Sequence, residues 1–364
     1  MLRRRVIGNI DWWLIAIAIS MALVGLATVY SATHLAASEH RDPFANQLKW
    51  LILGVVVMVV VMALDYRKVV KAAVVLHIVA VILLLIVLFV AEPIAGVRRW
   101  LSFGGLRFQP SELAKLTSML TLVGLFSGEH LKERPWWRIS LALVVVGVPF
   151  VLILRQPDFG TALTLFIPMI ILSFVAQRSL KPLVTLFALG ALGSIPGWFM
   201  LKEYQKTRIL AFLDPSYDEL GSGYQAIQSK IGIGSGGIFG KGFCESTQVR
   251  LDFLPARHTD FIFSVFAEEQ GLVGCFLFVA AFVFLMIIGF SIGFRAKDST
   301  GLLLAVGCIS LIGVQFLINV AMVLGMLPIA GLPLPFMSYG GSAMITLFAV
   351  IGLLESVQMR RYAF

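Results

Sequence analysis

The sequence predicts an all-α integral membrane protein with about ten transmembrane helices, and three observations predict it. First, 59% of the 364 residues are hydrophobic and only 13% are charged, whereas a soluble domain carries about 25% charged residues. Second, the apolar residues are gathered into runs of roughly 17–24 residues, long enough to cross about 30 Å of hydrocarbon as helices. Third, these runs do not alternate between polar and apolar residues, which excludes a membrane β-barrel.

The ten apolar runs follow one another along a single domain that covers residues 1–364. The second and the fifth runs are the shortest. The first is longer than the apolar core of a signal peptide, and no small-residue cleavage site follows it, so we expect it to remain as a helix. The predicted helices are Trp12–Ala32, Leu51–Leu64, Val69–Val90, Pro110–Phe126, Ile139–Leu154, Phe159–Val175, Leu183–Leu201, Leu272–Phe294, Leu302–Gly325 and Gly341–Val357.

The distribution of basic residues predicts the orientation. Cytoplasmic loops of membrane proteins carry an excess of Lys and Arg. With the N-terminus inside, the inside segments hold more Lys and Arg than the short outside loops, beginning with Arg3, Arg4 and Arg5. Ten helices then leave both termini in the cytoplasm and put a long loop, about 202–260, outside between the seventh and eighth helices. We therefore expect a multi-pass protein of the cytoplasmic (inner) membrane, surrounded by membrane lipids.

Charge and cysteine content exclude other classes of function. The formal net charge is +9, but inside-loop positives account for about half of the Lys and Arg, and no soluble basic domain is present to hold nucleic acid. Cys275 and Cys308 fall within apolar helices, and only Cys244 lies outside. The sequence therefore predicts no nucleic-acid partner, no internal disulfide and no zinc site.

Two pairs of ionisable residues are predicted at membrane depth. Glu112 and Lys115 are three residues apart at the start of the fourth helix, on one face and within pairing reach. An unpaired charge there is costly, so the pair either fixes helix packing or takes part in substrate binding or conformational coupling. Glu268 and Glu269 have the same alternatives, or simply lie at the membrane interface.

Asp260 is the strongest candidate for a catalytic residue. It stands where the long polar loop meets the apolar stretch Phe261–Phe266. Partial desolvation at the outer membrane surface raises the pKa of a carboxyl group and makes it a better base. The alternative is that Asp260 caps the following helix, since Asp is a favoured capping residue. His258 either orients Asp260 or caps the same turn.

Basic residues and glycines gather in the outer loops. The stretch Gly232–Gly237, flanked by Lys230 and Lys241, offers backbone N–H groups for a diphosphate, or is a flexible surface loop. We expect Ala226–Lys230 to form a short helix, and Ile231–Gly242 to be irregular because of its glycines. Outer positive charge suits an anionic ligand such as a lipid diphosphate, or lipid head groups. The outer basic residues are Arg98, Arg99, Arg208, Lys230, Lys241, Arg250 and Arg257.

Long motifs in this sequence resemble those of the SEDS (shape, elongation, division and sporulation) family of peptidoglycan glycosyltransferases. The resemblance covers essentially the whole chain, in order. The region around Lys230 and Gly240–Gly242 is more similar to the elongation (RodA) branch than to the division branch. The motifs are Arg98–Leu101, Phe108–Lys115, Gln156–Thr161, Tyr224–Gly237, Phe253–Gly274, Asn319, Gly325–Pro328, Gly331–Phe336 and Ser338–Ser342.

The resemblance implies polymerisation of lipid II into β-1,4-linked glycan outside the cytoplasmic membrane. Asp260 matches the family's essential aspartate and would be the single base that takes a proton from the acceptor sugar, while a polyprenyl diphosphate leaves. Two positions depart from the family pattern: Ala256 replaces a common glutamate, whose role is therefore in doubt here, and Ser246 replaces a common glycine. Asp158-Phe159-Gly160 also spells a kinase triplet, but it lies between membrane helices and we read that match as a coincidence.

We also predict the cofactors, the partners and two groups of site residues. No cofactor is required by the sequence, although a divalent cation (Mg or Mn) could hold the diphosphate. The implied partners are a class B penicillin-binding protein, lipid II and other proteins of the elongation complex. The expected diphosphate- or sugar-binding residues are Arg98, Arg99, Lys115, Lys230, Lys241, Arg257 and His258, and the expected structural or coupling residues are Glu112, Lys115, Glu268 and Ser338.

Two functions of other classes also fit ten helices with intramembrane charges. One is a lipid II flippase or other transporter, and the other is a non-catalytic scaffold for cell-wall enzymes. The lack of a convincing internal repeat argues weakly against an inverted-repeat transporter. Polymerisation by the purified protein, and its loss in Asp260→Asn, would separate the enzyme from both.

Overall fold

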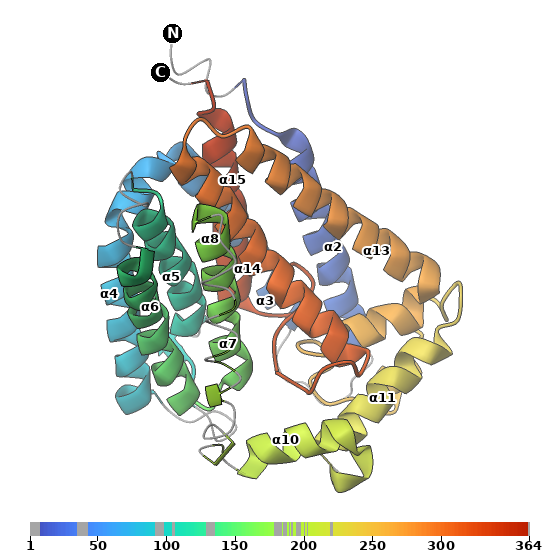
Figure 1. Ribbon diagram of the computed structural model, residues 1–364. Helices are drawn as coiled ribbons and strands as arrows, with labels where there is room; N and C mark the ends of the chain where they lie inside the picture. Colours follow the sequence, from blue (N-terminus) through green and yellow to red (C-terminus); the bar gives the residue numbers. More distant parts are fainter. Residues whose placement is uncertain are drawn as a thin grey trace.

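The computed structural model describes residues 8–34, 43–91, 98–103, 106–128, 135–177, 203–218 and 221–362, with scattered positions between 184 and 201. Helices dominate the described part of the chain (Figure 1). They are α2 (Trp12–His34), α3 (Pro43–Ala63), α4 (Tyr66–Val90), α5 (Pro110–Phe126), α6 (Pro135–Arg155), α7 (Phe159–Thr164), α8 (Phe166–Gln177), α10 (Glu203–Leu213), α11 (Ser222–Ser235), α12 (Thr247–Arg250), α13 (Ile262–Phe294), α14 (Ser299–Val323) and α15 (Gly341–Met359), with a 3-10 turn η1 (Pro215–Asp218).

The membrane-spanning architecture predicted from composition is confirmed. Among the described residues, 8 helical segments are long and apolar enough to cross a membrane, with α7 and α8 forming one of them. Helix α5 coincides with the predicted fourth run but has 17 residues and carries a buried ion pair. The predicted helix 183–201 lies largely outside the described residues, so the count of ten stays a prediction.

Several helices begin earlier than the apolar runs indicated, and α3 and α13 differ most. Helix α3 starts at Pro43 rather than Leu51, and proline favours the first turn of a helix because it lacks an N–H group. Helix α13 starts at Ile262 rather than Leu272, and it is broken at Gly271, whose φ is 64°. The two glutamates that interrupt the apolar pattern there are buried and hydrogen-bonded, so the helix extends through them.

The helices form a bundle with α5, α14 and α15 inside. Most residues of α14 and α15 are buried, whereas α3 and α4 expose apolar side chains such as Val59 and Phe89 to the surroundings. Such exposed apolar faces suit contact with lipid. The start of α2 and the end of α15 meet, since Asp11 N donates to Glu355 Oε2 at 3.2 Å. In Figure 1 helices α10 and α11 lie at the opposite end.

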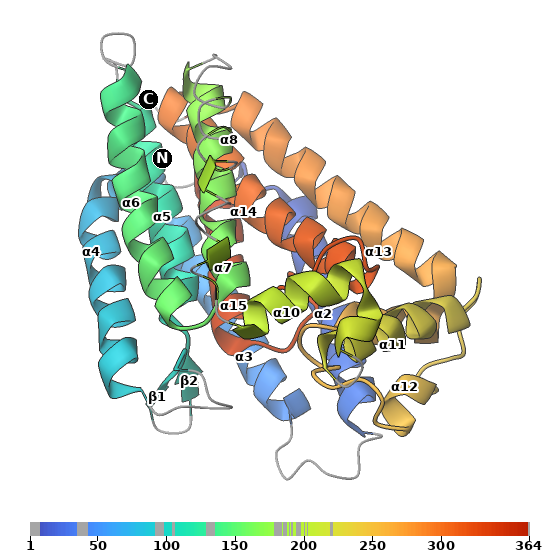
Figure 2. The same cartoon turned by 60° about the horizontal axis from the view of Figure 1, so that its bottom comes forward.

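The predicted long outer loop is not irregular but folded into short helices. Helices α10, α11 and α12 and the turn η1 occupy this segment. Helix α11 continues through Ser235, so the prediction that residues from Ile231 onward are irregular was wrong for its first turn and a half. A small hairpin joins the same end of the bundle (Figure 2), with strand β1 (Leu101–Phe103) antiparallel to β2 (Leu106–Phe108).

Candidate active site

Asp260 lies directly before α13, at the end of the bundle that carries α10 and α11. The residue that caps α13 is Phe261, without a side-chain capping bond, so Asp260 is not the helix cap that the sequence allowed as an alternative. Its half-buried carboxylate faces Gly331, where an added Cβ would lie 3.5 Å from Asp260 Oδ2. The carboxylate is therefore close to the loop that leads from α14 to α15.

The surroundings of Asp260 make its carboxyl group a better base. The pKa of Asp260 is raised to about 6, first by burial and then by the negative charge of Asp158, while the charges of Arg208 and Arg99 offset part of the rise. A general base works best when its pKa is near the operating pH. At neutral pH this carboxylate is ionised yet retains more affinity for a proton than an exposed aspartate.

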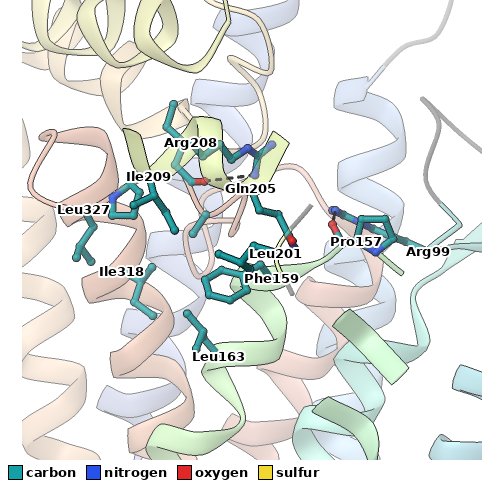
Figure 3. A pocket seen from close by; sticks show the side chains of 13 residues that line it. Arg99, Pro157, Phe159, Leu163, Leu201, Gln205, Arg208, Ile209, Ile318 and Leu327 are labelled. Carbon is teal, nitrogen blue, oxygen red and sulfur yellow. Dashed lines mark hydrogen bonds between the residues drawn. The ribbon is translucent and has the colours of Figure 1, made fainter. Parts of the chain in front are cut away.

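A cavity of about 140 Å³ lies beside these charges. Its walls come from α7, α10, α14 and the segment after α14, and among the described lining residues the charged ones are Arg99 and Arg208 (Figure 3). An apolar wall with two cations fits an anionic, lipid-linked ligand. The lining residues are Arg99, Pro157, Phe159, Leu163, Leu201, Gln205, Arg208, Ile209, Ile318, Leu327, Pro328, Ile329 and Ala330.

Arg208 also lines a second, smaller cavity of about 20 Å³, to which Lys230 contributes from α11. Arg208 Nη1 donates to Ile329 O at 3.3 Å, which holds its guanidinium on the wall that both cavities share. Lys230 lies alongside Gly325, where an added Cβ would be 3.1 Å from Lys230 Cδ. The side chains of Arg208 and Lys230 thus line the same small cavity.

Arg99 is held firmly from one side. Its Nε donates to Gln156 O at 3.2 Å, its Nη2 donates to Pro157 O, and its Nη1 is 3.6 Å from Asp158 Oδ2. Asp158 is buried and also accepts a bond from Thr161 N, which caps α7. Arg99 therefore joins the hairpin end to the start of α7 and borders the cavity in a fixed position.

Four other outer basic residues make contacts elsewhere and do not line either cavity. Arg98 is exposed and donates to Leu88 O. Lys241 pairs with Glu268 at 2.6 Å, and Arg250 with Glu245 at 2.6 Å. Arg257 is buried, donates to Ala32 O at 3.0 Å and pairs with Asp252. Arg98, Lys241 and Arg257, which were expected to bind substrate, are thus engaged with other partners and absent from the lining of both cavities.

The glycine stretch does not offer the free backbone groups that a diphosphate cradle needs. Its first part belongs to α11, and the N–H groups of Gly236, Gly237 and Gly240 donate to carbonyls within the stretch. Lys241 N and Gly242 N donate to the carbonyls of Glu268 and Glu269. The prediction of a diphosphate cradle was wrong because the acceptors of these N–H groups could not be seen in the sequence. They are carbonyls of the stretch itself and of helix α13.

The two glutamates of α13 are buried and hydrogen-bonded to other segments of the chain. Glu268 is fully buried and accepts bonds from Ser246 Oγ, Thr247 Oγ1 and Lys241 Nζ. Glu269 is buried and accepts a bond from Ser31 Oγ on α2. These contacts fit the structural role expected of Glu268, and that role and the alternative of a position at the membrane interface both stay predictions.

The remaining predicted residues make contacts within the protein and do not line either cavity. Glu112 and Lys115 form the predicted ion pair at 2.8 Å, buried within the bundle. Lys115 therefore does not line the cavity. Ser338 Oγ donates to Thr259 O at 2.6 Å, next to the candidate base. The ring of His258 packs edge-on against Tyr339 at 5.6 Å, which favours a role in holding this turn.

Two residues of the site were underestimated from the sequence. Asp158 was read as part of a coincidental triplet, although an Asp directly before an apolar helix is a capping signal. Arg208 was grouped with six other outer cations and not singled out. Its distinction, a position on the wall of both cavities near Asp260, depends on the fold of α10 against the segment after α14.

Comparisons with known proteins show the family of this chain. A family model described as cell cycle protein, FtsW/RodA/SpoVE, matches residues 11–363. Peptidoglycan glycosyltransferase MrdB of Escherichia coli K12 is 38% identical over 94% of this chain and 93% of its own length. A solved structure described as a peptidoglycan synthase complex, which coordinates polymerization and crosslinking, matches with a TM-score of 0.82 at 31% identity, over 98% of this chain and 99% of the other.

The rod shape determining protein RodA of Thermus thermophilus matches with a TM-score of 0.72 at 29% identity, over 98% of both chains. The expected similarity to the elongation branch is thereby confirmed. Both the sequence match and the fold match extend over almost the whole chain, so they include the segments that form the cavity and carry Asp260. The chain belongs to the FtsW/RodA/SpoVE family of cell cycle proteins.

Proposed function

We propose that this protein is a peptidoglycan glycosyltransferase that polymerises lipid II into β-1,4-linked glycan strands at the outer face of the cytoplasmic membrane during cell elongation. The observation that carries the proposal is the position of Asp260 beside an apolar cavity with two cations, where its pKa is raised to about 6. Family membership and the name of the Escherichia coli relative support the same reaction class.

The reaction assigns one task to each part of the site. Asp260 takes the proton from the acceptor sugar hydroxyl as that oxygen attacks the anomeric carbon of the donor sugar. The bond from that carbon to the diphosphate breaks, and the polyprenyl diphosphate leaves with the bonding electrons, with inversion at the carbon. One carboxylate suffices because the leaving group is already an anion, whereas hydrolases generally use two carboxylates.

Arg208 and Lys230 are the cations that we assign to the diphosphate. Both border the smaller cavity, and Arg208 also borders the larger one. A cation fixed where negative charge develops stabilises the departing group without further reorganisation. The polyprenyl chain would lie along the apolar wall formed by residues such as Phe159, Leu163 and Ile318.

A divalent cation and a protein partner complete the proposal. Among the described residues no three His, Cys, Asp or Glu side chains converge, but Mg²⁺ is commonly held by one or two carboxylates together with substrate phosphates. Asp158, together with the substrate diphosphate, would hold such an ion, which would neutralise diphosphate charge and leave Asp260 available as the base. We infer that a class B penicillin-binding protein crosslinks the product and that both termini of this chain lie in the cytoplasm.

The test is polymerisation of lipid II by the purified protein together with its penicillin-binding partner. We expect long glycan from the wild-type protein and none from Asp260→Asn, which keeps the shape of the side chain but removes the base. If Asp260→Asn polymerises normally while translocation of lipid II is blocked, the protein is a transporter and the enzymatic proposal fails.

A further inference from the structure

Two sets of polar contacts on successive turns of α14, joined through the connecting segment, link the ion pair inside the membrane bundle to the main chain of Asp260. It begins with Glu112 and Lys115 on α5, whose charged atoms are 2.8 Å apart. Lys115 Nζ also donates to Gln315 Oε1 on α14 at 3.1 Å. Gln315 Nε2 in turn donates to Pro333 O at 2.9 Å, in the segment that connects α14 to α15.

The next turn of α14 completes the connection. Asn319 Nδ2 donates to Leu332 O at 2.6 Å and to Asp260 O at 2.9 Å. Gln315 and Asn319 are four residues apart and therefore lie on the same face of α14. That face holds two successive carbonyls of the connecting segment and the carbonyl of the candidate base.

The segment that precedes α13 is bound at three consecutive carbonyls. His258 O accepts a bond from Tyr339 N at 2.9 Å, Thr259 O from Ser338 Oγ at 2.6 Å, and Asp260 O from Asn319. Ser338 Oγ also accepts a bond from Leu334 N at 2.7 Å. The main chain of the base is therefore fixed to the connecting segment and to α14 rather than to its own helix.

The chemistry of lysine gives the ion pair a directional role. A protonated lysine only donates hydrogen bonds, so the Gln315 oxygen must face Lys115 and its NH₂ group must face Pro333 O. The carboxylate of Glu112, 2.8 Å from Lys115 Nζ, compensates the buried ammonium charge, and removing one partner of a buried pair leaves an uncompensated charge. Reversing the Gln315 amide would set two donors against each other and leave the Pro333 carbonyl without its donor.

We propose that Glu112, Lys115, Gln315 and Asn319 are positioning residues that hold the main chain of Asp260 and thereby aim its carboxylate at the cavity. The inference rests on the proposed function, in which Asp260 is the base. It assigns the intramembrane ion pair to alignment of the catalytic group and not to contact with substrate. A misplacement of about 1 Å at a reacting group reduces turnover by about 10²-fold.

The test uses variants that leave no isolated buried charge. One removes both charges of the pair, Glu112→Gln with Lys115→Met. The second is Gln315→Met, and the third combines all three substitutions. Ser310→Ala is the matched control, because Ser310 is buried on the same helix but bonds only to Gly307 O in its own turn.

We expect each of the first two variants to lower the turnover of lipid II by about 10²-fold with KM changed less than about twofold, since a lost alignment affects the transition state and not binding. Because the residues act in series, the combined variant should lose no more than either alone. Ser310→Ala should behave like wild type. A raised KM with unchanged turnover, or losses that multiply in the combined variant, would overturn the proposal.

Hydrogen exchange supplies a measurement that does not depend on activity. In Gln315→Met, the N–H groups of Leu334 and Tyr339 should exchange faster than in Ser310→Ala, since the segment that they fix loses one of its two side-chain attachments to α14. Unchanged exchange at both positions would refute the connection even if catalysis falls. If the wild-type protein makes no glycan, the proposed function fails, and the exchange result alone then decides the positioning role.

Discussion

Adding one methyl group at Gly160 should displace the wall of the cavity beside Asp260. Gly160 lies in the first turn of α7, and an added Cβ would be 2.2 Å from Ala330 O and 3.0 Å from Ala330 C. A carbon atom next to a carbonyl oxygen needs about 3.2 Å, so Gly160→Ala forces a shift of about 1 Å. Ala330 lines the cavity and precedes Gly331, which faces the carboxylate of Asp260.

The expected cost has two parts. Overpacking of this kind destabilises a protein by about 1–3 kcal/mol, and a shift of about 1 Å at the reacting groups lowers turnover by about 10²-fold. Gly147→Ala in α6 is the matched control, because its added Cβ meets no atom within 4 Å. In that variant alanine only improves helix propensity, by up to about 1 kcal/mol.

The assay compares glycan synthesis from lipid II with thermal unfolding for both variants in detergent. Gly160→Ala should be folded, with a moderately lower Tm and a much lower turnover, while Gly147→Ala should match or exceed the wild-type Tm and keep its turnover. Wild-type turnover in Gly160→Ala would refute the claim that the contact between α7 and Ala330 sets the geometry around the base.

Two further predictions follow from the charges of the site. Turnover should rise as pH increases through about 6, because the pKa of Asp260 is raised to that value and a protonated carboxyl cannot accept a proton. In Asp158→Asn the midpoint of the pH profile should move to lower pH, because the charge that helps to raise this pKa is gone. An unmoved midpoint would contradict the electrostatic effect of Asp158 on Asp260. Arg208→Gln and Lys230→Gln should each lower kcat/KM for lipid II about tenfold, as for loss of one charged hydrogen bond, whereas Arg250→Gln, whose partner is Glu245, should not.

Much of the fold could be predicted from composition because the membrane acts on each helix separately. A segment that crosses hydrocarbon must satisfy its backbone internally and present apolar side chains, so the local run of residues determines the helix. The ion pair of Glu112 and Lys115 was predictable for the same reason, since spacing along one helix places them together. The apolar-run criterion placed the start of α13 too late, at Leu272 instead of Ile262. It failed because the polar Glu268 is satisfied by a partner distant in sequence and therefore does not end the helix.

The partners of the outer charges were decided by the tertiary structure. Seven basic residues look alike in the sequence, and only the folded chain shows that Lys241 and Arg257 are occupied elsewhere while Arg99 and Arg208 border the cavity. The sequence by itself determined a bundle of apolar helices with one promising carboxylate at its edge. Whether that carboxylate is aligned, desolvated and accompanied by cations depends on contacts between segments far apart in the chain, whose electrostatic energies depend on distance in space rather than separation in sequence.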